Sequence, residues 1–414
     1  MESKDGCHRL IESFEVLKDA RGGYSIQYPL IEIVFLTVCS VLSGFSDWDE
    51  VVDFGQEKLA WLRKYLPYKR GIPSHDTLNR VMGMIDYRAF EQCFVNWATM
   101  SIELPKGVVI NLDGKKLRSS ATKQEQQTAH KDGGKSAAHL VEAWCSAFQI
   151  CLAQYKTASK SNEITAIPVI LDWLEISGCV VTVDAMGCQR DIASKIVGKG
   201  GDYVLALKGN QESLHLAVIE AFEQTGAEAT LGAVHEQVER GHGRTEKRTC
   251  RVLSAQDVPW WGKPEEWEGL KSILEVCSQR TVMSTKLLQT EKRYYISSLC
   301  DTAEGFNQKI REHWQIENQL HWSLDVTFGE DASRKRSRNS AQNFGLIRRI
   351  ALNVLKSHPE KISLHRKMNK CAMSDSYREM LLHTIVGTNT QTINSAWTKI
   401  MMRLPCPPPR FSGH

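Results

Sequence analysis

Two short, largely apolar runs that each end on an aspartate constrain the fold of this chain most strongly. Residues 108–112 precede Asp113, and residues 179–183 precede Asp184. Runs of this kind, separated by helical segments, are typical of strands in a sheet that helices cover on both faces. Ligands collect at the carboxyl ends of the strands in such sheets. We therefore predict an α/β fold in which both aspartates lie at one edge of the sheet.

The segments around these two runs continue the alternation of strands and helices. Further strands are predicted at 139–148, 149–157, 202–207, 272–276 and 293–298, and helices at 164–174, 188–197, 211–222 and 302–326. The first 100 residues are predicted to be helical, with helices near 29–42, 57–65 and 74–84. A turn at 68–72 has the spacing of a helix-turn-helix with Arg80 on its second helix, but most such helix pairs only pack together.

Asp113, Asp184 and Glu317 are the candidate metal ligands. Two carboxylates held close together repel each other unless a cation lies between them, and Mg²⁺ prefers oxygen ligands. A pair of such ions serves phosphoryl transfer. Glu317 lies in an apolar helical segment, where its alternative role is an ion pair with Lys309 or Arg311. Each acid alone is a common surface feature, so the prediction depends on the strand, strand, helix order of all three.

A zinc site is the competing interpretation of the same helix. His313, Glu317 and His321 recur every four residues and therefore share one helix face. The segment has neither the His-Glu-x-x-His order nor a motif for a fourth ligand, so the magnesium interpretation is favoured. We expect the two histidines to contact DNA or to satisfy buried hydrogen bonds.

The distribution of charge indicates a polyanionic partner more clearly than the net charge of +4 does. Residues 334–370 hold eleven Lys and Arg side chains and one acid, Glu360. Such a local excess attracts phosphate backbones, although a solvated basic helix face has the same composition. Lys115 and Arg118 follow the first aspartate, and Lys208 closes the strand after the second.

Cysteine spacing and hydropathy indicate the cellular compartment in which the protein works. The twelve cysteines contain no Cys-x2–4-Cys pair, which argues against a zinc ribbon and for buried thiols in a reducing cytosol. The charged N-terminus has no signal-peptide run, and the apolar stretch 33–42 is shorter than the roughly 20 residues that span a bilayer. We expect a cytoplasmic, nucleoid-associated protein without a membrane partner.

Several motifs, in order along residues 8–380, resemble those of the H-repeat-associated transposases of bacterial insertion sequences. They are Asp113-Gly-Lys-Lys-Leu-Arg118, Lys160-Ser-Asn-Glu-Ile164, Val183-Asp-Ala-Met-Gly-Cys-Gln189, Gly201-Asp-Tyr, Lys208-Gly-Asn-Gln211, Gly241-His-Gly-Arg244, His313-Trp-Gln-Ile-Glu-Asn318, Leu320-His-Trp-Ser-Leu-Asp-Val326 and Glu330-Asp331. The resemblance implies an RNase H-like mixed sheet with flanking helices, in which Asp113, Asp184 and Glu317 form the metal-binding triad.

The resemblance also implies a division into five segments. Residues 1–100 form a helical, transposase-associated domain that could bind DNA ends, and 105–223 form the first part of the catalytic core. A partly β insertion covers 224–291, and 292–382 complete the core with basic C-terminal helices. Residues 383–414 match nothing in the family and are expected to be a disordered tail.

One family signature is altered around the last acid. Related transposases carry Tyr-x2-Arg-x3-Glu-x6-Lys, whereas this chain has Ile310, His313 and Leu324 at the Tyr, Arg and Lys positions. Arg311 and Arg334 are candidates to replace the missing cations. The complete set of candidate DNA contacts is Lys115, Arg118, Lys208, Arg244, Arg311, His313, Arg334 and Arg336.

The function predicted from these features is DNA transposition with two Mg²⁺ or Mn²⁺ ions. The expected partners are double-stranded DNA, as terminal inverted repeats and as target, and a second copy of the chain when two ends are paired. Two alternatives stay open. One is a metal-dependent nuclease that does not join strands, and the other is a DNA-binding relic without catalysis.

Overall fold

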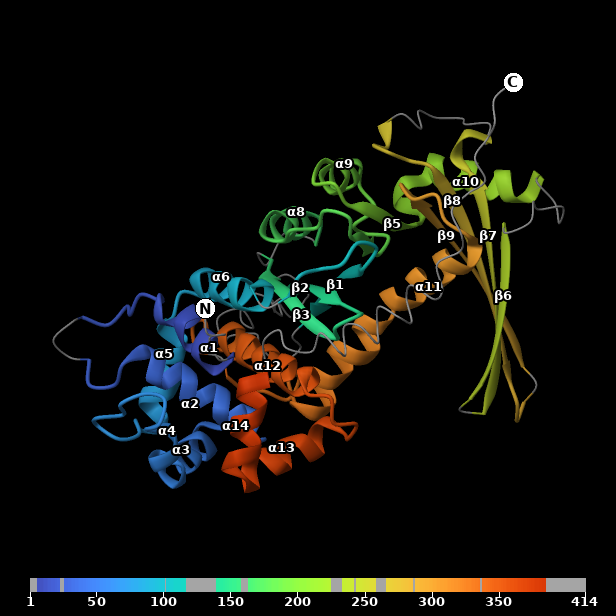
Figure 1. The fold of residues 1–414 in the computed structure, drawn as a ribbon. Coiled ribbons are helices and arrows are strands. Elements are labelled where there is room, and N and C mark those ends of the chain that lie inside the picture. Colours follow the sequence, from blue (N-terminus) through green and yellow to red (C-terminus); the bar gives the residue numbers. More distant parts are fainter. Residues whose placement is uncertain are drawn as a thin grey trace, which may run out of the picture.

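A mixed nine-stranded sheet flanked by helices forms the centre of the molecule (Figure 1). The computed structural model describes residues 6–22, 26–100, 102–116, 139–157, 163–224, 233–241, 243–257, 266–285, 287–335 and 337–384. The strands are β1 Val109–Lys116, β2 His139–Cys145, β3 Ile150–Lys156, β4 Val180–Val183, β5 Asp202–Leu207, β6 Val234–Gly241, β7 Arg244–Ser254, β8 Ser272–Val282 and β9 Leu288–Ser297.

The sheet has the RNase H-like arrangement that the family resemblance implied. Its order is β3-β2-β1-β4-β5-β9-β8-β7-β6. The pairs β1–β2 and β2–β3 are antiparallel, whereas β1, β4 and β5 are parallel to one another. Antiparallel pairing resumes from β5 to β9 and continues outward to β6.

Helices lie on both faces of the sheet and at one end of it. They are α1 Gly6–Glu15, α2 Leu30–Leu42, α3 Trp48–Glu57, α4 Leu59–Leu62, α5 His75–Met84, α6 Tyr87–Thr99, α8 Glu163–Trp173, α9 Arg190–Gly198, α10 Glu212–Gln224, α11 Ala303–His313, α12 Ser340–Ser357, α13 Leu364–Met373 and α14 Asp375–Thr384. In the described part of the chain, no helix has the length and apolar character needed to cross a bilayer.

Neighbouring residues of the central strands face opposite helical layers. Val109 and Val180 belong to the same apolar cluster as Phe306 of α11. Ile110 and Val181, one residue further along each strand, belong to the larger core that includes the buried faces of α8 and α9. Because side chains alternate along a strand, apolar residues are required on both faces, which explains the continuous apolar runs in the sequence.

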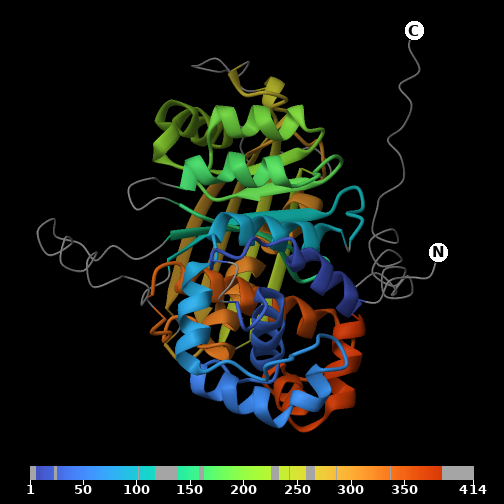
Figure 2. The same cartoon turned by 90° about the vertical axis from the view of Figure 1, so that its left-hand side faces the viewer.

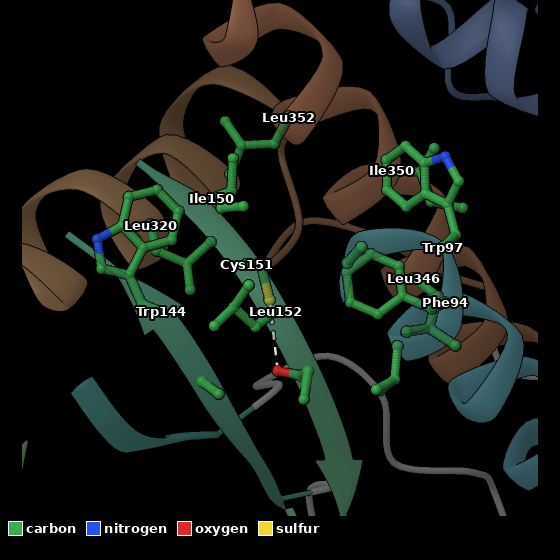
Figure 3. Packing of buried hydrophobic residues seen from close by; sticks show 14 of the residues in the cluster. Phe94, Trp97, Trp144, Ile150, Cys151, Leu152, Leu320, Leu346, Ile350 and Leu352 are labelled. Carbon is green, nitrogen blue, oxygen red and sulfur yellow. Dashed lines mark hydrogen bonds between the residues drawn. The ribbon is translucent and has the colours of Figure 1, made fainter. Parts of the chain in front are cut away.

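The N-terminal and C-terminal helices form one packed unit although they lie at opposite ends of the chain (Figure 2). Helix α12 packs against α2, α5 and α6 on one side and against β3 on the other. Figure 3 shows Phe94 and Trp97 of α6 near Leu346 and Ile350 of α12 in this common core. The predicted N-terminal segment 1–100 therefore shares its core with the sheet and the C-terminal helices.

Two predictions for the N-terminal helices have different outcomes. The helix predicted at 74–84 is confirmed as α5, where the Ser74 hydroxyl accepts a hydrogen bond from the Thr77 amide. The helix predicted at 57–65 is wrong in its extent, because α3 ends at Glu57 and α4 is a single turn. The first helix of the suggested helix-turn-helix is therefore only this turn, and its DNA-binding role stays a prediction.

The segment predicted as an insertion extends the main sheet instead of forming a separate one. Strands β6, β7 and β8 and the beginning of β9 lie within 224–291 and pair in antiparallel order beyond β5. The predicted boundary at 291 falls inside β9, so the division at that residue stays a prediction. The last described residue is Thr384, and the predicted tail beyond it lies outside the described residues.

The helix predicted at 302–326 is confirmed with an irregularity near its middle. It begins as α11, capped by the Thr302 side chain, and continues as two π-helical segments, η5 Ile316–His321 and η6 Ser323–Thr327. π-Helical turns inside helices are rare and are frequent at functional sites. This helix carries the third candidate acid, Glu317.

Candidate active site

Asp113 and Asp184 each follow the last pair of residues that joins the parallel strands β1 and β4. That pair is Leu112 and Val183; Asp113 lies within β1, which continues to Lys116, and Asp184 directly follows β4. The alternation of side chains directs both aspartates toward the face that α11 covers. The prediction that both acids lie at one edge of the sheet is confirmed.

The main chain after β4 holds the Asp184 side chain in place. Asp184 Oδ1 accepts hydrogen bonds from the amides of Met186, at 3.1 Å, and Gly187, at 3.2 Å. Asp113 Oδ1 accepts from the amide of Gly114 at 2.9 Å. Burial and, to a lesser extent, the negative charges of Asp184 and Glu142 raise the pKa of Asp113 to about 6, against the opposing effects of His321 and the Gly114 amide.

A small polar cluster joins the C-terminal end of α11 to the two strands. The Asn111 side chain donates to the Glu312 carbonyl at 2.8 Å and accepts from the Thr182 hydroxyl at 2.9 Å. Thr182 Oγ1 also lies 3.0 Å from Nδ1 of His313. Burial lowers the pKa of His313 to about 4, so its ring is neutral near pH 7 and the hydrogen bond fixes its orientation.

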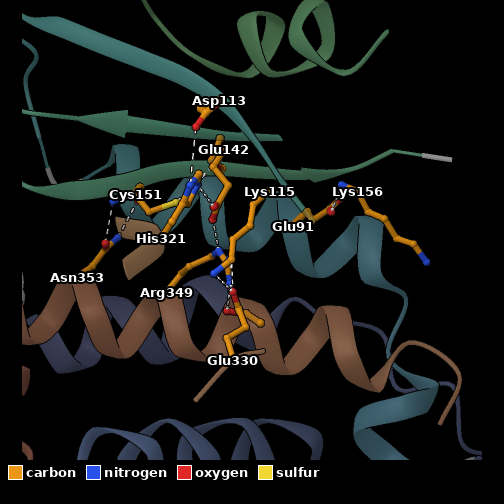
Figure 4. Close-up of polar contacts among 12 residues, drawn as sticks. Glu91, Asp113, Lys115, Glu142, Cys151, Lys156, His321, Glu330, Arg349 and Asn353 are labelled. Atoms are coloured by element: carbon orange, nitrogen blue, oxygen red, sulfur yellow. Dashed lines mark hydrogen bonds and ion pairs between the residues drawn. The ribbon is translucent and has the colours of Figure 1, made fainter. Parts of the chain in front are cut away.

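His321 connects Asp113 to a buried carboxylate on the neighbouring strand (Figure 4). Its Nε2 lies 2.9 Å from Glu142 Oε2, and its Nδ1 lies 3.7 Å from Asp113 Oδ2. Burial alone would lower the pKa of His321, but Glu142 and Asp113 outweigh burial and raise it. The ring lies between two carboxylates that favour its protonated form, and one of them is a candidate metal ligand.

Arg349 of α12 completes this arrangement from inside the core. Its guanidinium donates to Glu142 and, at 2.6 Å, to Glu330 Oε1. Lys115 Nζ lies 2.8 Å from Glu330 and 2.6 Å from Asp325. Burial raises the pKa of both glutamates, but nearby cations outweigh it. Arg349 and His321 hold the pKa of Glu142 at about 2, and Arg349 and Lys115 hold that of Glu330 well below its usual range. The network fixes the face of β1 and β2 that carries Asp113.

Glu317 is exposed and lies on η5, between the two histidines of the same helix face. The partners considered for an ordinary ion pair are occupied elsewhere: Lys309 pairs with Asp301 at 2.6 Å, and Arg311 pairs with Glu239. Among the described residues, Glu317 contacts neither aspartate, and no three His, Cys, Asp or Glu side chains are grouped closely enough to hold a metal ion. The structure thus gathers Asp113 and Asp184 and leaves Glu317 apart.

The same facts bear on the zinc interpretation. His313 shares a hydrogen bond with Thr182, and His321 forms an ion pair with Glu142, so the two rings contact different strands. The expectation that these histidines satisfy buried hydrogen bonds fits the contact of His313. The role of His313 as a DNA contact stays untested.

The predicted DNA contacts differ in their accessibility. Lys208, Arg244 and Arg334 are exposed, whereas Arg118 and Arg336 lie outside the described residues. Lys115 is only 6% exposed and is paired with two carboxylates, so interpreting it as a phosphate contact does not fit the structure. Its position beside Asp113 in sequence suggested DNA, but β1 turns its side chain toward the core.

The basic segment 334–370 is also less available than its composition indicated. Four of the ten cations that the structure describes in this segment are buried: Lys335, Arg348, Arg349 and Lys367. Lys367 donates to the carbonyls of Leu355 and His358, each at 2.7 Å. A considerable part of the positive charge therefore stabilises the helical unit.

Four residues of the site were not predicted from the sequence: Glu142, Glu163, Glu330 and Arg349. Glu142 is directly opposite Asp113 in the antiparallel register of β1 and β2. Glu142 could have been predicted from the sequence, because it is the one acid in the otherwise apolar strand 140–145. Glu163, the first residue of α8, and Glu330 both lie within motifs that the sequence analysis quotes, whereas only the contacts of Arg349 identify it.

The donor set at this edge fits a divalent cation of the kind that oxygen ligands select. Asp113 and Asp184 approach closely enough that the charge of Asp184 raises the pKa of Asp113. Such repulsion between carboxylates is relieved when a cation binds between them. The described part of the site presents carboxylates and imidazoles and no thiolate, which favours a hard ion.

Comparison with known proteins identifies the family of this chain. A family model described as Transposase DDE domain matches residues 104–354, and a model for the region associated with that domain matches residues 11–98. The chain belongs to the transposase DDE domain family.

Curated relatives in bacteria are named as transposases. Putative transposase YncI of Escherichia coli O157:H7 is 40% identical over 90% of this chain and 94% of its own length. H repeat-associated putative transposase YhhI of Escherichia coli K12 is 39% identical over 90% of this chain and 97% of its own. A short relative, 36% identical over 18% of this chain, is named Inactive transposase YbfQ.

Among solved structures, a piggyBac transposase synaptic complex with hairpin DNA is similar to this chain. The TM-score is 0.44 at 12% sequence identity, and the match covers 98% of this chain and 82% of the other.

Proposed function

We propose that this chain is an active transposase that cuts DNA at the two ends of its own insertion sequence and joins the freed 3′ ends to target DNA. The observation that carries the proposal is the pair Asp113 and Asp184, which directly follow Leu112 and Val183, the last residues paired between the adjacent parallel strands β1 and β4. Membership in the transposase DDE domain family supports the type of reaction.

We assign Asp113, Asp184 and Glu317 as ligands of two Mg²⁺ or Mn²⁺ ions. When bound, such ions generate a nucleophile at neutral pH and stabilise the leaving oxygen of an in-line displacement. The assignment of Glu317 is supported by its helix face, because the flanking His313 and His321 contact the two strands that end in the aspartates. Its usual ion-pair partners are also engaged elsewhere.

The protein's own side chains orient the reacting groups. The amides of Met186 and Gly187 fix one carboxylate oxygen of Asp184 and leave the other for a ligand. His321 lowers the pKa of Asp113, so the carboxylate is ionised at a lower pH than it would be if burial acted alone. The exposed Lys208, Arg244 and Arg334 would bind the phosphate backbone, and two copies of the chain would hold the paired ends.

A cleavage and joining assay tests this proposal. Duplexes from both flanks of the gene, labelled at one 5′ end, are incubated with the full chain and Mg²⁺, beside Asp184→Asn and the control Asp172→Asn. Asp172 is an exposed acid of α8 that pairs with Lys195. We expect cleavage at one position and a joined product with the wild type and the control, and neither product with Asp184→Asn although it still binds DNA.

The same assay separates the alternatives. Cleavage without a joined product would identify a nuclease, and binding without cleavage by any of the three proteins would identify an inactive relic. Cleavage retained by Asp184→Asn would contradict the assignment of the site.

A further inference from the structure

Glu163, the first residue of α8, lies at the same edge of the sheet as the two aspartates but approaches from the other face. Asp113 faces α11, and its neighbour Gly114 faces α8 because side chains alternate along β1. A Cβ atom built on Gly114 would lie 1.8 Å from Glu163 Oε1 and 2.2 Å from its carboxyl carbon. The Glu163 carboxylate therefore occupies the space that a side chain at position 114 would fill.

The position of Glu163 is set by the fold and not by a local ion pair. Helix α8 follows β3 and packs on β2 and β3, which directs its first residue toward the end of β1. Among the described residues, Glu163 forms an ion pair with Nδ1 of His139, at 3.9 Å, and burial together with nearby Lys116 lowers the pKa of that histidine. The carboxylate thus has only a weak partner in the described part of the site.

The charges around Glu163 are those of the acid pair. Burial and the negative charges of Asp184 and Asp113 together raise the pKa of Glu163 to about 7, against the opposing effect of His321. A partly buried glutamate that is packed against Gly114 and repelled by two carboxylates is costly for the folded protein without a cation. No contact among the described residues offsets this unfavourable energy.

We propose that Glu163 is a fourth carboxylate ligand of the divalent metal ions in this site, and that Gly114 is a glycine so that this carboxylate can reach the strand ends. This inference rests on the proposed function, since it requires the ions assigned to Asp113 and Asp184. In this arrangement the two aspartates bind from the strand ends, Glu317 from the α11 face and Glu163 from the α8 face.

Manganese binding by the full chain in the absence of DNA tests the inference directly. Mn²⁺ is titrated calorimetrically into the wild type, Glu163→Gln, Asp184→Asn and the control Asp172→Asn, which lies on the same helix. We expect Glu163→Gln to weaken Mn²⁺ binding by roughly tenfold or more, or to lower the number of bound ions, while Asp172→Asn matches the wild type. Gly114→Ala should have the same effect, and the double variant should be no weaker than Glu163→Gln.

Thermal unfolding in EDTA separates a ligand from a residue that only supports the fold. Removing a repelled carboxylate should leave the Tm of Glu163→Gln equal to or above that of the wild type, whereas its stabilisation by added Mn²⁺ should fall. A lower Tm in EDTA would point to a structural role and overturn the inference.

The outcomes distinguish this inference from the proposed function. If Glu163→Gln binds Mn²⁺ like the wild type while Asp184→Asn does not, Glu163 is no ligand, and the two-aspartate site stands. If Asp184→Asn also binds like the wild type, the metal site itself is misassigned, and both proposals fail together.

Discussion

Replacing Arg349 by Met should destabilise the whole protein, because it leaves two buried carboxylates without their main partner. The guanidinium is fully buried and donates to Glu142, to Glu330 at 2.6 and 3.2 Å, and to the Gly345 carbonyl at 2.9 Å. Removing one partner of a buried ion pair costs about 3–5 kcal/mol. His321 and Lys115 would still compensate part of the remaining charge.

The dependence of this loss on pH gives a second, independent check. Arg349 holds the folded-state pKa of Glu142 at about 2 and lowers that of Glu330, so its stabilisation is complete above the ordinary glutamate pKa of 4.5. Stabilisation is lost as the pH falls from that value toward 2. The difference in unfolding free energy between wild type and Arg349→Met should therefore shrink over this range.

Urea denaturation followed by circular dichroism measures both effects. One core joins the N-terminal helices, the sheet and α12, which favours a single main transition. The control is Lys195→Met, which breaks an exposed pair with Asp172 and should cost at most about 1 kcal/mol. A loss below about 1 kcal/mol for Arg349→Met, or a loss that does not change between pH 7 and pH 3, would refute the reasoning.

Three further predictions concern the site and its DNA partner. Mn²⁺ affinity should rise with pH through about 6–7, because Asp113 and Glu163 must lose protons to act as ligands; a flat profile between pH 5 and pH 8 in titration calorimetry would contradict this. His321→Ala should move that profile to higher pH, because the histidine lowers the pKa of Asp113, and an unchanged profile would exclude this electrostatic role. Lys208→Ala and Arg244→Ala should each lower the slope of log K against log salt by about one in fluorescence anisotropy with duplex DNA, whereas Lys195→Ala should not change it.

The central sheet could be predicted from sequence because both of its faces are buried. The strand predicted at 202–207 is confirmed as β5, and both aspartates lie where the apolar runs end. The outer strands were harder to predict from the sequence, because β6 and the start of β9 are exposed and lack a continuous apolar pattern. Their membership in the same sheet depends on pairing that composition does not indicate.

The polar network behind Asp113 could not be predicted, because its members are far apart in sequence. Lys115 and Arg349 share Glu330, although 234 positions separate the two cations. Sequence proximity to Asp113 suggested that Lys115 binds phosphate, whereas ion pairs with Asp325 and Glu330 hold its side chain in the interior. A charged residue such as Lys115 has several possible partners in the sequence, and its actual partner is known only once the fold brings particular residues together.

The most direct test of the account is the rate of DNA cleavage by Glu317→Gln under single-turnover conditions. The control is Glu304→Gln, an exposed acid in the first turn of α11. With equal DNA occupancy confirmed by gel shift, we expect Glu317→Gln to lose on the order of 10³-fold in rate and Glu304→Gln to match the wild type. Cleavage by Glu317→Gln at the wild-type rate would contradict the assignment of the triad.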